Sequence, residues 1–150
     1  MPPPEVWGPP VWTLFHSLSC QLNNPDLIKP LFVCIQRICR FLPCPECSED
    51  ATTFLQKVRL SDVKTCDDLS MALYLFHNHV NKKKQKGLYS YSDMSKYKSY
   101  NLIVAFNNFV RVYNTRGNMK MITEDFQRNR IIDEFKKWIG TNISSFSLKP

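Results

Sequence analysis

Residues 9–22 read Pro-Pro-Val-Trp-Thr-Leu-Phe-His-Ser-Leu-Ser-Cys-Gln-Leu, with apolar residues recurring at helical spacing. The residues that follow this spacing are Val11, Leu14, Phe15, Leu18 and Leu22. Because an α-helix turns once in about 3.6 residues, the spacing gathers them on one helical face. Pro9 and Pro10 suit the first turn of such a helix, where a missing N–H costs no hydrogen bond. The stretch therefore predicts an amphipathic helix packed on a hydrophobic core.

The same periodicity recurs along the rest of the chain. We expect further helices over about 26–42, 45–58, 66–86, 92–97, 102–113 and 124–139. Thr65 and Asp68 have the spacing of a capping box, and Gly87 suits a helix end. With only 4 glycines for tight turns, the sequence predicts an all-α fold, an up-down four-helix bundle with a short fifth helix.

The predicted organisation is a single domain. We assign the bundle to residues 1–100 and expect residues 101–150 to form a C-terminal helical extension packed on it. The tail after Thr141 is expected to fray, as chain ends commonly do.

Composition argues against several classes of protein. Hydrophobic residues make up 43% of the 150 residues and aromatic residues 13%, whereas disordered chains are poor in both. No run of apolar residues is long enough for a membrane span. The opening Met-Pro-Pro-Pro-Glu lacks the basic and apolar regions of a signal peptide, so we expect a cytoplasmic location. The net charge of +7 comes without an aromatic-interleaved basic motif, so nucleic-acid binding is not expected.

Cys44-Pro45-Glu46-Cys47 is the pair of cysteines, among 6, with the spacing of a working dithiol. Pro45 suits the first position of a helix, which places both sulfurs at a helix N-terminus. The partial positive charge there stabilises a thiolate and raises its reactivity. Because the chain lacks signs of secretion, the other cysteines are interpreted mainly as free, buried thiols.

Two other uses of a C-x-x-C remain as alternatives. A zinc site needs about four ligands, and the chain has neither a second C-x-x-C nor an H-x-x-x-H. A thioredoxin-like fold needs strands around the motif, and the pattern here is helical. A zinc-binding module and a non-enzymatic helical interaction module are the alternatives to a redox enzyme.

Aromatic and polar residues on the predicted first and fourth helices form a candidate slot for a planar heterocycle. They are Trp12, His16, His77, Asn78 and Asn81, together with Tyr91 further along the chain. Taken singly, each has an ordinary reading as a core or surface residue. Their joint occurrence with the dithiol favours a bound aromatic cofactor.

These residues resemble the Erv/ALR family of flavin-linked sulfhydryl oxidases, and are most similar to its compact members encoded by large DNA viruses. The resemblance runs from about Trp7 to Tyr97. It consists of Gly8 with W-x-x-x-H, then C-x-x-C, then His-Asn-His-Val-Asn at 77–81, then Lys86 and Tyr91.

The resemblance implies a helical bundle that holds FAD beside the dithiol, with Cys44 and Cys47 as catalytic residues and no metal. The cofactor-binding residues that it implies are Gly8, Trp12, His16, His77, Asn78, Val80, Asn81, Lys83, Lys86 and Tyr91. Lys83 and Lys86 would face the pyrophosphate or ribose, and Tyr91 the adenine.

The implied activity is the formation of protein disulfides. A substrate thiolate attacks Cys44, and electrons pass from Cys47 through the flavin to molecular oxygen, giving hydrogen peroxide. The implied partners are thiol-containing proteins or a small redox relay protein, and a second copy of the chain in a homodimer. A virus-encoded member would work in the host cytoplasm or the virion.

The sequence departs from the family pattern at three points. Lys84 stands where a leucine is common after the Asn81 turn. Tyr91 stands where many members have tryptophan, although either ring can stack. The shuttle pair that cellular members often carry on a tail is missing, since there is no second C-x-x-C or C-x-C. Substrates are therefore expected to reach Cys44 directly or through a separate relay.

Overall fold

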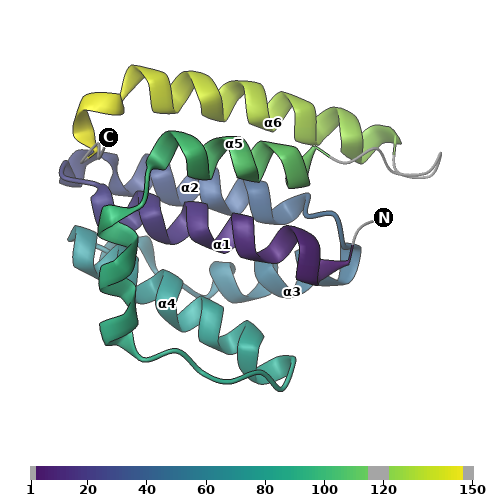
Figure 1. The fold of residues 1–150 in the computed structure, drawn as a ribbon, viewed down its shortest axis with the longest axis horizontal. Coiled ribbons are helices and arrows are strands. Elements are labelled where there is room, and N and C mark those ends of the chain that lie inside the picture. Colours follow the sequence, from purple (N-terminus) through teal and green to yellow (C-terminus); the bar gives the residue numbers. More distant parts are fainter. Residues whose placement is uncertain (1–2, 115–121, 147–150) are drawn as a thin grey trace.

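The computed structural model describes residues 3–114 and 122–146, and the described part is mostly helical (Figure 1). The α-helices are α1 (Pro4–Gln21), α2 (Ile28–Arg40), α3 (Pro45–Gln56), α4 (Cys66–Lys83), α5 (Leu102–Tyr113) and α6 (Ile122–Thr141). The 3-10 helices are η1 (Pro25–Leu27), η2 (Leu60–Asp62), η3 (Tyr91–Ser99) and η5 (Ile143–Ser145). The predicted all-α fold is confirmed.

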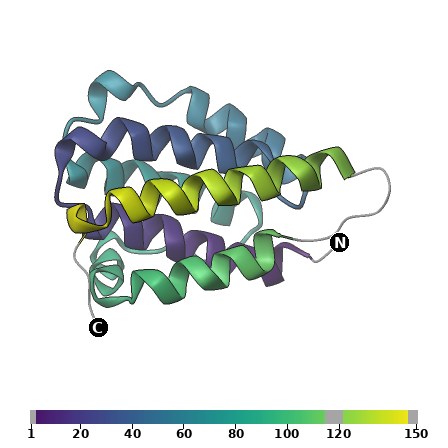
Figure 2. The same cartoon turned by 90° about the horizontal axis from the view of Figure 1, so that it is seen from above.

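The helices pack in pairs around one hydrophobic core. α1 lies against α4, α5 and η3, while α2 lies against α3 and α6. Figures 1 and 2 show α5 and α6 on one side of α1 and α2, with α3 and α4 on the other. Four helices contribute fully buried side chains to this core. Examples are Leu14, Phe32, Leu73 and Phe109, each at 0% exposure. This packing fixes α1, α3 and α4 around the site described below.

The first helix begins earlier than its prolines indicated. α1 starts at Pro4, so Pro9 and Pro10 lie inside it rather than in its first turn. Proline at these positions leaves the Glu5 and Val6 carbonyls without their i+4 donors. Both of those residues are exposed, so water can satisfy them. Burial of Trp7, at 5% exposure, offsets the cost and holds the additional turns against the core.

The predicted capping box at the start of α4 is confirmed, but the helix ends before Gly87. Thr65 Oγ1 accepts from the Asp68 N–H at 3.0 Å, and the Asp68 carboxylate accepts from the Thr65 N–H at 3.1 Å. At the other end Gln85 takes a left-handed conformation with φ 60°. The Lys86 N–H then reaches the Asn81 carbonyl at 2.8 Å, which closes the helix with Gln85 in the role usually given to glycine.

Two further expectations are revised. The short fifth helix is η3, a 3-10 helix that runs longer than 92–97. Residues 142–146 are not frayed, because Phe146 is buried and forms an isolated bridge with Leu22. The rest of the predicted tail lies outside the described residues.

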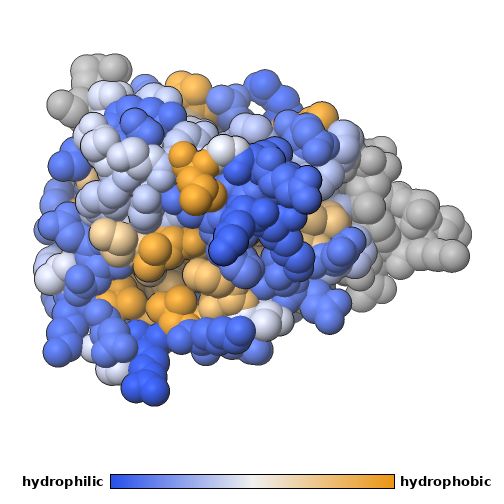
Figure 3. All heavy atoms as spheres, turned by 90° about the horizontal axis from the view of Figure 1, so that it is seen from below, coloured by the Kyte–Doolittle hydropathy of each residue, from blue (hydrophilic) through white to orange (hydrophobic). Residues whose placement is uncertain are grey.

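The face seen from below is mostly hydrophilic, with apolar atoms gathered around one hollow (Figure 3).

On the exposed side of α4, Met71 and Leu75 are 39% and 53% exposed. In the part of the chain that the structure describes, no helix is both long and apolar enough to cross a membrane.

Candidate active site

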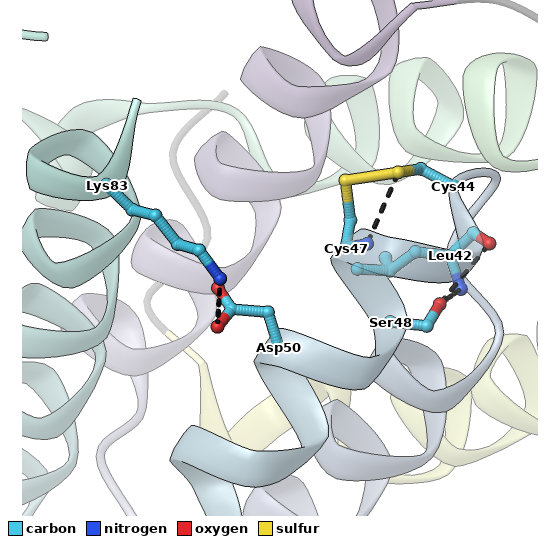
Figure 4. The surroundings of a disulfide bond; sticks show 6 residues. All are labelled: Leu42, Cys44, Cys47, Ser48, Asp50 and Lys83. Atoms are coloured by element: carbon cyan, nitrogen blue, oxygen red, sulfur yellow. Dashed lines mark hydrogen bonds and ion pairs between the residues drawn. A yellow bond between two sulfur atoms is a disulfide. The ribbon is translucent and has the colours of Figure 1, made fainter. Parts of the chain in front are cut away.

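The dithiol sits at the start of α3, as predicted. Cys44 is the N-cap residue, and Pro45 occupies the first turn. The two cysteines form a disulfide with their Cα atoms 5.2 Å apart, and Cys44 Sγ accepts from the Cys47 N–H at 3.2 Å (Figure 4). A sulfur that caps a helix in this way accepts a free backbone donor and lies in the positive end of the helix dipole. The same position would stabilise a Cys44 thiolate after reduction.

A cavity of about 300 Å³ lies beside the dithiol, between α1, α3, α4 and the segment that contains η3. Its wall includes Trp7, Gly8, Trp12, Phe15, Cys39, Cys47, Phe76, His77, Val80, Asn81, Lys83, Lys84, Lys86, Tyr89, Lys96, Tyr97 and Tyr100. We call this cavity the aromatic pocket. Cys47 borders it and Cys44 does not, so the two sulfurs face different surroundings.

Most of the residues predicted to bind a cofactor line the aromatic pocket. Gly8 and Trp12 come from α1, whereas the larger group comes from α4 and the turn after it. That group consists of His77, Val80, Asn81, Lys83 and Lys86. The three other predicted residues, His16, Asn78 and Tyr91, are placed outside the wall.

His16 lies directly behind the pocket wall. Its Nε2 is 2.9 Å from His77 Nδ1, and the Trp12 ring stacks on His77 with centroids 4.1 Å apart. Burial and the neighbouring His77 lower the pKa of His16 to about 3. Burial and the charge of Lys86 lower the pKa of His77 to about 4. Both rings are therefore neutral at physiological pH, so one of the two nitrogens donates and the other accepts in the bond between them.

Asn78 acts on the pocket through the loop beyond α4. Its Oδ1 accepts from the Tyr89 N–H at 2.9 Å, and its Nδ2 donates to the Tyr89 carbonyl at 3.0 Å. These two hydrogen bonds to one residue hold Tyr89 in the wall of the aromatic pocket. Tyr91 packs edge-on against Tyr74 with ring centroids 5.3 Å apart, and its predicted role at the adenine stays a prediction.

Sequence reasoning missed the tyrosines of the η3 side of the pocket. Tyr89, Tyr97 and Tyr100 line it, and Lys96 Nζ lies 5.3 Å and 5.1 Å from the ring centroids of Tyr89 and Tyr97. Burial raises the pKa of Tyr97 to about 12, so its hydroxyl stays protonated. The signal was a spacing of three between Tyr97 and Tyr100, which brings side chains together on one side of a helix; their ring centroids lie 5.3 Å apart.

A free thiol also borders the pocket. Cys39 borders it from α2, is 1% exposed, and burial strongly raises its pKa. The described residues contain no cluster of three or more His, Cys, Asp or Glu side chains able to hold a metal ion, which leaves the zinc alternative without a ligand set there.

The neutral histidines make stability depend on pH. Their folded pKa values lie below the usual 6.5, so the unfolded chain binds more protons between about 3 and 6.5. Stability is complete above this window and falls as the pH drops through it. Urea unfolding is expected to show that the free energy of unfolding declines as the pH is lowered from 7 to 4.5. The decline should be smaller in the His77→Gln variant. Asp68, whose pKa is lowered from 3.8 by hydrogen bonds from the Lys64 and Thr65 N–H groups, loses its contribution only at pH values below this measured range.

His79 provides the control for this prediction. Its side chain is 43% exposed, so His79→Gln is expected to keep the wild-type decline. Equal stability of the wild-type protein at both ends of the range would contradict the assignment of two neutral, buried rings.

Comparison with known proteins identifies the chain's relatives. The sequence profile described as the Erv1 / Alr family matches residues 9–101. An FAD-linked sulfhydryl oxidase of African swine fever virus (isolate Pig/Kenya/KEN-50/1950) is 31% identical over 90 residues, covering 58% of this chain and 75% of the relative. A putative FAD-linked sulfhydryl oxidase of Invertebrate iridescent virus 3 is 30% identical over 87 residues, covering 55% of this chain and 59% of that protein. No solved structure matches the chain. The match spans the dithiol and nearly all of the aromatic pocket, and the chain belongs to the Erv1/Alr family.

Proposed function

We propose that this protein is an FAD-dependent thiol oxidase that forms disulfides in protein substrates. The observation that carries the proposal is the position of Cys47, a disulfide sulfur that borders an aromatic pocket. The related viral proteins are named FAD-linked sulfhydryl oxidases. A helical interaction module would not need a dithiol at such a pocket.

The residues of the pocket fit a flavin. Trp12, His77 and Tyr89 offer ring faces, and the buried Trp7 Nε1 has no hydrogen-bond partner among the described residues. A Cβ added at Gly8 would meet nothing within 4 Å. Protein packing therefore does not require glycine there, although glycine weakens a helix. A ligand that lies close to the backbone would explain it.

Cationic side chains at the pocket suit the phosphates of FAD. Lys83 Nζ is paired with the Asp50 carboxylate at 2.9 Å (Figure 4). Lys84, Lys86 and Lys96 also border the pocket, and within the described residues they have no carboxylate at ion-pair distance. We assign Lys86, with help from Lys83, to the pyrophosphate or ribose of FAD. We also propose that the other residues implied by the family resemblance contact the cofactor, with Tyr91 at the adenine. They are Gly8, Trp12, His16, His77, Asn78, Val80, Asn81 and Tyr91.

The dithiol performs the exchange chemistry. A substrate thiolate attacks Cys44 Sγ, a substrate–Cys44 disulfide forms, and the Cys44–Cys47 bond breaks to release the Cys47 thiolate. A second substrate thiolate then displaces Cys44, which leaves the substrate disulfide and two reduced cysteines. The N-cap position stabilises Cys44 as a leaving thiolate. When bound, FAD supplies a two-electron acceptor that molecular oxygen can reoxidise, giving hydrogen peroxide.

The proposal extends to partners and location. Thiol-containing proteins or a small redox relay protein would deliver electrons to Cys44, in the host cytoplasm or the virion. The exposed apolar residues Met71 and Leu75 on α4 support a homodimer. Sedimentation showing only monomer at micromolar concentration would remove the homodimer from the proposal.

The test is the visible absorption spectrum of the purified protein. We expect a flavin band that persists through gel filtration and bleaches when dithiothreitol is added without oxygen. Gly8→Ala is expected to lower the affinity for FAD about tenfold, because the new methyl group occupies space that the ligand needs. Its melting temperature without FAD should not fall, since alanine favours the helix by about 1 kcal/mol.

Gly140→Ala is the matched control. This α6 glycine also has nothing within 4 Å of an added Cβ, and it lies outside the aromatic pocket. It should leave FAD affinity unchanged. A colourless protein that takes up no added FAD would overturn the proposed function.

A further inference from the structure

The segment that leads into the dithiol begins where α2 ends. A helix C-terminus leaves carbonyls without intrahelical donors. Here the Ile38 carbonyl accepts from the Phe41 N–H at 3.1 Å and from the Tyr113 hydroxyl at 3.0 Å. The Phe41 carbonyl accepts from Arg128 Nη1 at 3.4 Å. Two carbonyls just before Cys44 are thus bound by side chains from α5 and α6.

These donors are deeply buried. Tyr113 is 0% exposed and Arg128 is 1% exposed. Burial of the phenol raises the pKa of Tyr113, so its hydroxyl keeps the proton that it donates. Arg128 is ion-paired with Asp125 one turn earlier on α6. A buried charged residue is weak support for stability, because apolar side chains of similar size commonly do as well. Stability alone therefore does not explain why an arginine is buried at this position.

The other end of the segment is bound by α3. The Leu42 N–H donates to Ser48 Oγ at 2.8 Å, and the Ser48 hydroxyl lies 3.4 Å from the Leu42 carbonyl (Figure 4). Phe41, three residues before Cys44, is thus held from α6, and Leu42, two residues before it, is held from α3. The path of this short segment determines where Cys44 Sγ lies relative to the Cys47 N–H.

We propose that Tyr113 and Arg128 are positioning residues, which hold the α2–α3 connection so that Cys44 Sγ stays on the N-terminus of α3. The inference rests on the proposed oxidase function. Both residues lie beyond 9–101, the part of the chain that the Erv1/Alr profile matches. The C-terminal helices thereby set the reactivity of the dithiol without touching it.

The test measures thiol reactivity rather than turnover. The fully reduced protein is alkylated with iodoacetamide across a pH series. Modification is quantified by fragment-ion mass spectrometry, which assigns it to Cys44 or to Cys47 within the peptide that holds both. In Tyr113→Phe and Arg128→Lys we expect alkylation at neutral pH to slow about three- to tenfold and its midpoint to move to higher pH, because less Cys44 is thiolate. Tyr113→Phe removes one hydroxyl from an otherwise intact ring, so the variant should fold.

Ile139→Val is the control for general loosening. Ile139 is a buried residue of α6, and no side-chain donor to α2 is lost in this variant. It should keep the wild-type alkylation profile. The inference is overturned if both test variants also keep that profile, or if Ile139→Val changes it as they do. Oxygen consumption by the wild-type protein is measured separately, and its absence would count against the proposed function alone.

Discussion

Replacing Cys47 with alanine is expected to lower thiol oxidation by about three orders of magnitude or more while FAD remains bound. Cys47 is the dithiol sulfur that borders the aromatic pocket. Without it, Cys44 is a lone thiol, and no Cys44–Cys47 disulfide remains for a substrate thiolate to attack. The measurements are oxygen consumption with dithiothreitol and the flavin absorbance of the purified variant.

Cys66→Ser is the control for this result. Cys66 is a free cysteine at the start of α4, outside the pocket wall, and its replacement should leave turnover unchanged. Substantial turnover by the Cys47→Ala protein would show that another sulfur passes electrons to the cofactor. Loss of FAD from that variant would instead contradict the expectation that the aromatic and cationic residues hold it.

Phe109→Ala is expected to lower the free energy of unfolding by about 3–5 kcal/mol. The Phe109 ring is fully buried, stacks on Tyr113 with centroids 4.9 Å apart, and meets Phe135 of α6 edge-on. The core that it helps to form includes residues of α1 and α2. We propose that the C-terminal extension and the bundle are a single domain. Urea unfolding of the Phe109→Ala variant should then remain a single transition, with its midpoint at a lower urea concentration than in the wild-type protein.

Phe126→Ala supplies a matched comparison. Phe126 is 76% exposed on α6, so the same substitution should change the free energy of unfolding by less than about 0.5 kcal/mol. An early, separate transition in Phe109→Ala would mean that the extension unfolds by itself, and it would argue against a single domain.

Local patterns were sufficient where the chain's own side chains set the structure. The apolar spacing predicted α5 over 102–113, and the structure has it at Leu102–Tyr113. Thr65 and Asp68 cap α4 through bonds between residues three apart, which a sequence displays directly. Pro45 placed the dithiol on a helix start for the same reason.

Features set by distant contacts could not be read in this way. The proximity of Tyr89 to the pocket depends on both bonds from Asn78, and the added turns of α1 depend on the burial of Trp7. The bonds from Tyr113 and Arg128 to α2 join residues 75 and 87 positions apart. No local period or spacing encodes such pairs, since they form only when the helices have packed.

Cys39 has a consequence for fidelity. An enzyme that makes and breaks disulfides risks trapping its own sulfurs in the wrong pairing, and this thiol borders the same cavity as Cys47. Exchange requires a thiolate. Because burial in an apolar setting keeps Cys39 protonated, it is a poor nucleophile even beside an oxidised pair. Burial in the hydrophobic core thus keeps Cys39 out of exchange with the Cys44–Cys47 pair, although both line or adjoin the same part of the molecule.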